Sequence, residues 1–550
     1  MNFCDKENVN ILTSLLIAHG VRHAFVCPGS RNAPIVHNLN ECEAISCHPV
    51  TDERSAGFQA IGLSMAEDYH PVVVCVTSGT ALLNLHPAVA EAFYQHIPLI
   101  VISADRPSQW IDQMDGQTLP QPNVFGKMVK KSVSLPEVQD KRPQEEQHWY
   151  CNRLVNECLL ACLDGDKGPV HINVAISEPL YSFTTTHLPQ ERKITLYDFD
   201  GDESCRNELA EVLNYAQRPL IILGQSEGRD QDQTLFKTLN GIFATLSEAL
   251  SIPTHFEETL ALAMEDERFH PDLIIYMGGH IVSKQLKLFL RNMQHVEQWR
   301  ISPSGNIEDT FMHLTKVIKT TPFHLADYLA SHHHPSTEEY TRLWNQELTK
   351  AKSKSQQFEP AYSSMAAIKH FHDSCIKQPC VIYGNSSAIR LGNLFANAHI
   401  YCNRGVNGIE GTLSTAVGFS ICERYTDKNV YCILGDLSFF YDQNALWNQN
   451  LRGNLRIMIL NNGGGAIFGK FQGLRQSKAR KEMVMAEHHT SAEGICKQNK
   501  IVYLAAHNME EMKAEMEKLI KAPSCRPMLL EVFTDIDIDN KMMEEYFKQQ

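Results

Sequence analysis

Several features that would point to other classes of protein are missing from this sequence of 550 residues. No uninterrupted apolar run approaches the roughly 20 residues that a membrane-spanning helix needs. The first residues, MNFCDKENVN, are polar and lack a basic stretch followed by an apolar one, so we expect no secretion signal. Excess positive charge is missing too, since the formal net charge is -14. These absences argue against a membrane or nucleic acid as the main partner and predict a cytoplasmic protein.

The 16 cysteines are scattered along the chain and include no pair with C-x-x-C spacing. Cys151, Cys158 and Cys162 recur at helical spacing, as small buried apolar residues do. We therefore expect reduced, structural thiols, which are usual in the cytosol. The adjacent histidines at positions 332–334 lie in a polar segment, residues 331–340, that we interpret as a solvated linker, because consecutive residues cannot all face one metal ion.

What the sequence does contain is a repeated alternation of short apolar runs, small-residue loops and amphipathic helices. Residues 23–27, 71–76 and 98–103 have the pattern of buried strands, and each leads into a loop of small or polar residues. The pattern returns at residues 219–224 and 273–279. Strands that alternate with helices predict parallel sheets covered on both faces.

This alternation predicts an α/β fold with three doubly wound parallel-sheet domains, because 550 residues are too many for one core. We expect the domains at residues 1–182, 200–335 and 350–550. In sheets of this kind, ligands bind beyond the carboxyl ends of the strands. The loops at those ends are therefore where functional residues are expected.

Two such loops in the third domain carry ligands for a hard cation. The strand at residues 430–434 leads into Asp436, and the strand at residues 455–460 leads into Asn462. A crossover helix, expected at residues 440–450, would bring both strand ends to the same edge of the sheet. One carboxylate and one amide oxygen suit Mg²⁺, which takes its other ligands from phosphate and water.

Other interpretations of this region stay open. A Gly-Asp pair after a strand and a run of glycines are also common in ordinary turns. Residues 464–470 spell GGAIFGK, which agrees in part with a phosphate-binding P-loop, but Phe471 stands where the Mg²⁺-binding Ser or Thr should be. The glycines at positions 463–465 would let the backbone come close to a phosphate in either case.

Taken together, the Gly-Asp pair after one strand and the Asn pair after the next resemble the cofactor motif of thiamine diphosphate-dependent enzymes. The resemblance implies thiamine diphosphate and Mg²⁺ or Mn²⁺ as cofactors, with residues 350–550 as the diphosphate- and metal-binding domain. It implies that Asp436, Asn462 and Gly464 bind the metal. Cofactor binding is implied for the same residues and for Gly435 and Leu437, the latter standing where the motif usually has glycine.

The cofactor also needs a carboxylate at its pyrimidine ring, and Glu53 is the candidate. Glu53 lies between a short strand and a helix rich in small residues, 55–66. A glutamate there could simply stabilise the helix N-terminus through the helix dipole. The resemblance instead implies that residues 1–182 are the pyrimidine-binding domain and that Glu53 binds and activates the cofactor of a partner subunit. A homodimer or tetramer with shared active sites is then expected.

Longer motifs resemble one family within that superfamily, the MenD family of menaquinone biosynthesis. They are CPGSRNAP at residues 27–34, ADRP at 104–107, GNSSAIR at 384–390, NRGVNGIEGTLST at 403–415 and GDLSF at 435–439. The resemblance spans nearly the whole chain but is weak in the middle domain. It implies a transferase that decarboxylates 2-oxoglutarate and adds the succinyl carbanion to isochorismate.

The resemblance also implies roles for individual residues. Those at the reacting centre and on the succinyl carboxylate are Ser386, Arg390 and Arg404. Those that bind isochorismate are Ser30, Arg31, Arg106, Gln117 and Lys284. Ile409, Ile467 and Phe468 would make apolar contacts with the cofactor. Both substrates are dicarboxylates, and arginine suits bidentate capture of a carboxylate, although any one of these arginines could be an ordinary surface charge.

The sequence departs from the family pattern at Gly116, Gln285 and Glu410. Two alternative functions remain. One is another thiamine diphosphate-dependent 2-oxo acid enzyme, of the acetolactate synthase or decarboxylase type, which acts on smaller monocarboxylates and has no need of the Arg390 and Arg404 pair. The other is a nucleotide-binding module, which would need neither Glu53 nor the metal ligands.

Overall fold

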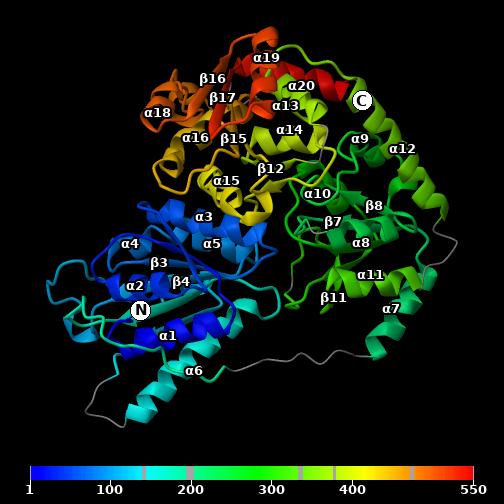
Figure 1. Cartoon of the computed structure of the whole chain (residues 1–550). Helices are drawn as coiled ribbons and strands as arrows, with labels where there is room; N and C mark the ends of the chain where they lie inside the picture. The colour runs from blue at the N-terminus through cyan, green and yellow to red at the C-terminus, as the bar shows by residue number, and fades with distance from the viewer. Residues whose placement is uncertain are drawn as a thin grey trace.

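The computed structural model describes residues 2–138, 144–193, 203–228, 230–306, 308–331, 338–375, 379–470 and 476–548. These residues form three separate sheets, and the strand pairings within them are parallel. In Figure 1 the sheets follow one another along the chain, from blue at the N-terminus through green to red. The prediction of an α/β fold with three parallel-sheet units is confirmed, while the domain boundaries stay predictions.

The N-terminal sheet has six strands in the order β2-β1-β3-β4-β6-β5. Its strand β3 (Val72–Val76) is buried along its whole length, as expected for an apolar run covered by helices on both faces. The other strands are β1 (His23–Val26), β2 (Ser46–Pro49), β4 (Leu99–Asp105), β5 (Lys131–Leu135) and β6 (Val170–Ala175). The helices are α1 (Glu7–Ala18), α2 (Ala33–Glu41), α3 (Glu53–Ala66), α4 (Thr80–Leu83), α5 (His86–Tyr94) and α6 (Gln144–Leu163), with short 3-10 turns at Ser108–Trp110 and Gly126–Met128.

The middle sheet has five strands in the order β11-β10-β9-β7-β8. These are β7 (Pro219–Leu223), β8 (Ala244–Ser247), β9 (Leu273–Met277), β10 (Glu297–Ile301) and β11 (Leu314–Ile318). Helices α7 (Glu203–Tyr215), α8 (Asp230–Asn240), α9 (Leu260–Glu265), α10 (Lys284–Arg291) and α11 (Pro322–Ser331) belong to this unit, with a 3-10 turn at Glu267–Phe269. Helix α12 (Glu338–Gln357) packs Tyr340, Trp344 and Leu348 into the same core before the chain enters the third unit.

The C-terminal sheet has the order β13-β12-β14-β15-β17-β16. Its strands are β12 (Cys380–Tyr383), β13 (Tyr401–Cys402), β14 (Val430–Gly435), β15 (Leu455–Asn461), β16 (Val502–Ala506) and β17 (Met528–Phe533). Its helices are α13 (Ser364–Ser374), α14 (Ser387–Phe395), α15 (Thr412–Ile421), α16 (Asp436–Tyr441), α18 (Glu493–Gln498), α19 (Met509–Lys521) and α20 (Ile536–Lys548). Short 3-10 turns lie at Glu423–Tyr425, Gln443–Leu446 and Ala466–Lys470, and a π-helical turn lies at Arg480–Val484.

The first and third sheets share one strand order, because each places its second strand at the edge beside its first and adds the third on the other side. The chain therefore changes direction across the sheet between β1 and β3, and again between β12 and β14. Loops at such a switch point diverge and leave a crevice at the carboxyl ends of the strands. Two equivalent crevices are therefore expected, one per domain.

Helices α3 and α15 hold these two domains together (Figure 1). A Cβ atom on Gly62 would lie 2.0 Å from the Thr415 carbonyl oxygen, and a Cβ on Gly418 would lie 2.1 Å from the Gln59 carbonyl oxygen. Small residues therefore let the two helix backbones approach closely. This explains why α3 is so rich in small residues, and it joins the two domains in one continuous apolar core.

The expected crossover helix at residues 440–450 is wrong. Helix α16 begins at Asp436 and ends at Tyr441, and a 3-10 turn follows at Gln443–Leu446. The carboxylate of Asp442 accepts hydrogen bonds from the backbone N–H of Ser414 at 2.7 Å and from its hydroxyl at 2.8 Å, which draws the chain toward α15. Asparagine side chains beyond this point bond the local backbone and compete with a helix.

The expected structural role of the cysteines is confirmed for α6, where Cys151, Cys158 and Cys162 are buried and unpaired. The interpreted linker at residues 331–340 lies mostly outside the described residues, including its histidines, and α12 already begins at Glu338. Among the described helices, none combines the length and apolar character needed to cross a membrane.

Candidate active site

The carboxylate of Asp436 lies at the carboxyl end of β14, where it forms the first residue of α16. One of its oxygens accepts a hydrogen bond from the backbone N–H of Leu437 at 2.6 Å. The other accepts from the N–H groups of Gly463, at 2.8 Å, and Gly464, at 3.0 Å. The two loops that the sequence singled out therefore meet, and Asp436 joins them.

Asn462 lies at the end of the neighbouring strand, β15, and its side chain has a fixed orientation. Its amide nitrogen donates a hydrogen bond to Asp539 at 2.9 Å. Asp539 is itself partly buried and is also bonded by Ser364. Because the amide nitrogen is engaged, the amide oxygen is the Asn462 side-chain atom that could bind a cation.

The glycine loop between them has backbone angles that favour glycine. Gly463 has φ of +79° and Gly464 has φ of +153°. A Cβ atom on either would also lie within 3.0 Å of a backbone carbonyl oxygen, that of His488 or Met485. Any other residue here would be strained and would clash, so the loop is built for close approach of the backbone.

Asp436 fits a bound cation because, among the described residues, its carboxylate pairs with no lysine or arginine and only with the ring of His488. The side chain is only 3% exposed, and burial raises the pKa of its carboxyl group. The nearest ring nitrogen, of His488, is 3.4 Å away. In the described part of the chain there is no cluster of His, Cys, Asp and Glu that could hold a metal, so a cation here would depend on one carboxylate with amide and carbonyl oxygens. That donor set suits Mg²⁺ together with a diphosphate.

Glu53 begins α3, and among the described residues its carboxylate has one hydrogen-bond partner. Asp52 caps the helix by accepting a hydrogen bond from the N–H of Ser55 at 3.2 Å. The Glu53 carboxylate accepts one from the side chain of Asn84 at 3.0 Å. Within the described residues no hydrogen bond or ion pair joins Glu53 to Asp436. On either side of Glu53, Asp52 accepts a hydrogen bond from the Asn444 side chain at 2.8 Å and Arg54 donates to the Tyr441 carbonyl oxygen at 2.9 Å, so the start of α3 packs beside the end of α16 in the same chain.

A cavity of about 630 Å³ lies between the middle and C-terminal domains. Arg390 on α14, Lys284 at the start of α10, and Ile467 all line it. The buried Nε of Arg390 has no hydrogen-bond partner among the described residues. Burial lowers the pKa of this guanidinium, and nearby Arg404 lowers it further, yet arginine stays charged at neutral pH. The cavity is therefore lined by the charged guanidinium of Arg390, whose Nε can still donate a hydrogen bond to a ligand.

Arg404 lies just after β13, buried, on the loop that carries the NRGVNG motif. It donates a hydrogen bond to the Asn385 side chain at 2.8 Å, while its own Nε has no partner in the part of the chain that the structure describes. The amide nitrogen of Asn385 donates to the carbonyl oxygens of Asn403, at 2.6 Å, and Gly408, at 2.7 Å. Next to Asn385, Ser386 has φ of +71°, a strained conformation of the kind that clusters at functional sites.

The residues predicted for isochorismate fall into separate groups in one chain. Arg31 donates to the Ile176 carbonyl oxygen at 2.9 Å and faces Glu178 at 3.5 Å, and Arg106 pairs with Asp115. Both follow strands of the N-terminal sheet, β1 and β4, as does Ser30. Gln117, with φ of +56°, lies beside Gly79. Lys284 instead lines the cavity of Arg390, in the middle domain.

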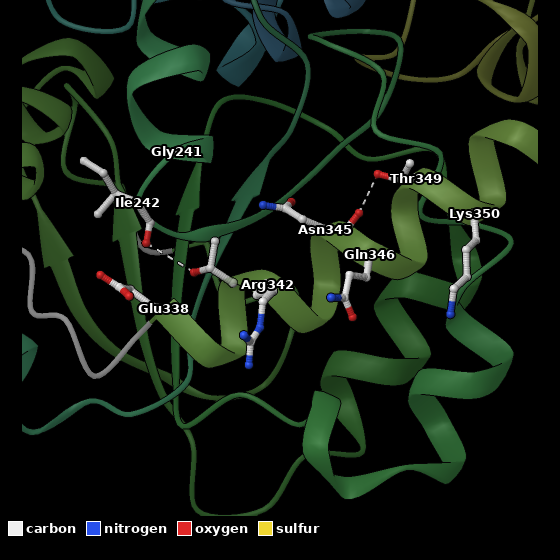
Figure 2. A pocket seen from close by; sticks show the side chains of 9 residues that line it. Gly241, Ile242, Glu338, Arg342, Asn345, Gln346, Thr349 and Lys350 are labelled. Atoms are coloured by element: carbon white, nitrogen blue, oxygen red, sulfur yellow. Dashed lines mark hydrogen bonds between the residues drawn. The ribbon is translucent and has the colours of Figure 1, made fainter.

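A second hollow of about 620 Å³ runs along α12 (Figure 2). It is lined by polar and charged side chains such as Glu338, Arg342 and Lys350. None of the predicted site residues lines it, so its size alone gives it no role in the chemistry.

Comparison with known proteins decides the family. Residues 7–127 match the N-terminal thiamine pyrophosphate-binding domain of thiamine pyrophosphate enzymes, and residues 385–532 match the C-terminal one. The chain is 45% identical to a 2-succinyl-5-enolpyruvyl-6-hydroxy-3-cyclohexene-1-carboxylate synthase of Phocaeicola vulgatus, over 99% of this chain and 98% of that protein. The synthases of Bacteroides thetaiotaomicron, at 44%, and Christiangramia forsetii, at 34%, are similar over at least 97% of each chain. The chain belongs to this synthase family.

The synthase family relation also supports thiamine diphosphate as the cofactor, because both matched domains bind it. Three apolar residues were predicted to contact that cofactor. Ile467 lines the Arg390 cavity, while Ile409 and Phe468 are 38% exposed in the single chain. Leu437 stays close to Asp436 through its backbone N–H. Their predicted roles are compatible with these positions and stay predictions.

Sequence reasoning missed several residues of the candidate synthase site. Glu248 and Glu257 line the cavity opposite Arg390, and burial raises the pKa of Glu248 to about 7. Both lie in the middle domain, where no motif was recognisable, so no pattern could have identified them. Asn385 lies inside the GNSSAIR motif and could have been singled out. Glu91, on α5, is the fourth, because its carboxylate bonds the backbone that follows Arg404.

Proposed function

We propose that the chain is a thiamine diphosphate- and Mg²⁺-dependent synthase. It decarboxylates 2-oxoglutarate and joins the succinyl unit to isochorismate, giving 2-succinyl-5-enolpyruvyl-6-hydroxy-3-cyclohexene-1-carboxylate and CO₂. The observation that carries this proposal is the pair of arginines, Arg390 and Arg404, whose buried Nε groups have no hydrogen-bond partner among the residues that the structure describes. Buried donors without partners are costly, and a carboxylate would satisfy both. The product is the one for which the similar synthases are named. The arginine pair would explain why a dicarboxylate is the substrate.

The metal in this proposal is Mg²⁺ or Mn²⁺, held by the carboxylate of Asp436, the amide oxygen of Asn462 and the carbonyl oxygen of Gly464. The buried Asp436 carboxylate and the oriented Asn462 amide support this assignment. Gly435, Leu437 and the glycine loop line the place of the diphosphate. A divalent cation would offset the negative charge of both the diphosphate and Asp436.

Bound thiamine diphosphate supplies a carbon nucleophile that can hold the electrons released when CO₂ leaves. Glu53 would hold a proton at the pyrimidine N1′ and so favour that nucleophile. In thiamine diphosphate enzymes that this chain resembles, the glutamate and the metal site come from different subunits, so we propose a homodimer, or a tetramer made of two dimers, in which partners complete each site. Two exposed aromatic residues that follow Asp436 in the chain support such an interface: Tyr441, 52% exposed and 4.8 Å from the Arg54 guanidinium, and Trp447, 60% exposed.

The remaining assignments match basic and polar side chains to the carboxylates of the two substrates. Arg390 and Arg404 orient the distal carboxylate of 2-oxoglutarate, with Ser386 at the reacting centre. Isochorismate is bound by Ser30, Arg31, Arg106, Gln117 and Lys284, brought together by the partner subunit. The reaction would take place in the cytoplasm.

An acetolactate synthase or decarboxylase is the alternative that shares the cofactor. The test supplies the purified chain with thiamine diphosphate, Mg²⁺ and either 2-oxoglutarate or pyruvate, each with and without isochorismate. We expect rapid CO₂ release only from 2-oxoglutarate, and only when isochorismate is present. Preferential use of pyruvate, or of pyruvate with a second pyruvate, would favour the alternative.

A further inference from the structure

The loop that carries Arg404 is held by a side chain from another domain. Glu91, on α5 of the N-terminal domain, is buried, and one of its carboxylate oxygens accepts a hydrogen bond from the N–H of Gly405 at 2.9 Å. The other oxygen accepts from the N–H of Val406 at 2.8 Å. Gln95, one turn along, also donates to Glu91. A carboxylate thus binds two successive backbone amides immediately after Arg404.

The packing around this contact leaves little room for movement. A Cβ atom on Gly405 would lie 2.8 Å from the Glu91 carbonyl oxygen and 3.0 Å from the Cβ of Tyr94, so the loop backbone rests directly on α5. Gln225 of the middle domain donates to the side chain of Gln95, at 3.1 Å, and to the carbonyl oxygen of Cys402, at 3.0 Å. All three domains therefore meet at residues 402–406.

Glu91 is an ionisable side chain in the protein interior, where carboxylates are unusual. Burial raises the pKa of its carboxyl group, and the Val406 and Gly405 amides act against that shift. No ion pair of Glu91 with a lysine or arginine is found among the described residues, so backbone and amide N–H groups carry the stabilisation. A buried carboxylate is costly unless it is fully bonded. The hydrogen bonds of Glu91 fix the backbone of the two residues that follow Arg404.

We propose that Glu91 is a positioning residue, which sets the Arg404 guanidinium for the oxo-acid carboxylate from a different domain. Asn385 fixes the side chain of Arg404 at 2.8 Å, and Glu91 fixes the backbone that follows it. Movement of this loop would displace Arg404 while leaving Asp436 and Asn462, on other strands, in place. The naming of 2-oxoglutarate as the ligand rests on the proposed function.

The test is a double-mutant cycle in the full-length enzyme with thiamine diphosphate and Mg²⁺. Glu91→Gln keeps the shape but offers one acceptor oxygen in place of a carboxylate. We expect KM for 2-oxoglutarate to rise about tenfold, with KM for isochorismate and cofactor affinity changed less than about twofold. In an Arg404→Ala background, Glu91→Gln should add less than about twofold, because its effect passes through Arg404. Equal effects in both backgrounds, or an equal change in both KM values, would overturn the proposal.

Matched variants separate positioning from simple loss of stability. Glu67→Gln makes the same change at a half-buried carboxylate that bonds Arg22 and His23 at the far end of α3, and it should leave both KM values unchanged. Glu91→Asp keeps the charge on a shorter side chain and should raise KM for 2-oxoglutarate less than Glu91→Gln does. If it instead leaves KM unchanged while Glu91→Gln unfolds the enzyme, Glu91 is only structural.

A second readout does not depend on the proposed function. Hydrogen exchange at the Gly405 and Val406 amides, measured without substrates, should be faster in Glu91→Gln than in Glu67→Gln, because the carboxylate protects both groups. Unchanged exchange contradicts the positioning role itself. Faster exchange with no selective effect of Arg404→Ala on 2-oxoglutarate would instead leave Glu91 as the anchor of the loop and reject the carboxylate role of Arg404.

Discussion

At the scale of single residues, the candidate site is built from buried charges bonded mainly by backbone amides. Asp436 accepts from Leu437, Gly463 and Gly464, and Glu91 accepts from Gly405 and Val406. Backbone N–H groups orient a carboxylate without cancelling its charge. Asp436 is left able to bind a cation, whereas both oxygens of Glu91 are used to hold a loop.

The first prediction concerns Asp436. Asp436→Ala should abolish Mg²⁺-dependent binding of thiamine diphosphate, because the charge of the diphosphate would no longer be balanced through the metal. Calorimetric titration of the cofactor with and without Mg²⁺ measures this. Asp427→Ala, at an exposed position before β14, is the control and should bind normally. Tight, Mg²⁺-dependent binding by Asp436→Ala would show that the metal is held elsewhere.

The second prediction concerns the arginine pair. Arg390→Ala or Arg404→Ala should each remove a charge-assisted hydrogen bond of about 1.5–3 kcal/mol to the distal carboxylate of 2-oxoglutarate. That corresponds to a fall of roughly ten- to 150-fold in kcat/KM for 2-oxoglutarate. The poor use of pyruvate, which lacks that carboxylate, should change much less.

A surface arginine provides the control for this pair. Arg268, paired with Asp266 on the surface of the middle domain, can be changed to alanine without effect on either oxo acid. If Arg390→Ala and Arg404→Ala lower the use of both oxo acids by the same factor, the arginines do not bind the distal carboxylate.

At the scale of elements, buried parallel strands were the most predictable features. Strands β3, β7 and β14 are continuous apolar runs, and their observed limits lie within one residue of those expected. Strand β5 was not predicted, because Lys131–Leu135 alternates polar and apolar residues at a sheet edge. The helix expected at residues 440–450 was wrong because tertiary bonds from Asp442 to Ser414 override local helix preference.

The third prediction concerns the contact between α3 and α15. Gly62→Ala should destabilise the protein by about 1–3 kcal/mol, because the new methyl group would meet the Thr415 backbone. Gly494→Ala is the matched control, since it lies in α18 with nothing within 4 Å of the added atom. It should be neutral or stabilising, as alanine favours helix. Thermal unfolding of both variants compares them, and equal melting temperatures would mean that the helices are not in close contact.

At the scale of the whole molecule, the sequence predicted which loops matter but not how they assemble. The loops after β14 and β15 meet as expected, because parallel strands place their carboxyl ends on one edge. The sharing of sites between subunits rests on the family resemblance alone, because no sequence pattern states which contacts are made between subunits. Glu248 and Glu257 of the middle domain were equally hidden, since only the fold brings them to the cavity that Arg390 also lines.

The fourth prediction tests shared sites by complementation. Glu53→Gln should bind cofactor but lose most turnover, and Asp436→Ala should lose cofactor. If partners complete each site, co-refolding the two variants in equal amounts forms mixed dimers with one intact site. Activity should then return to about a quarter of the wild-type value, since half of the dimers are mixed. No recovery in mixtures shown to exchange subunits would place Glu53 and Asp436 in sites within one chain.

The most direct test of the central claim is the mass of the product. The wild-type enzyme, with thiamine diphosphate and Mg²⁺, is given 2-oxoglutarate labelled in its carbon chain together with unlabelled isochorismate, and products are separated by liquid chromatography and identified by mass spectrometry. The account predicts one adduct that carries the label, has the combined mass of both substrates less CO₂, and forms only when both are present. Labelled succinic semialdehyde as the main product, formed equally well without isochorismate, would contradict it.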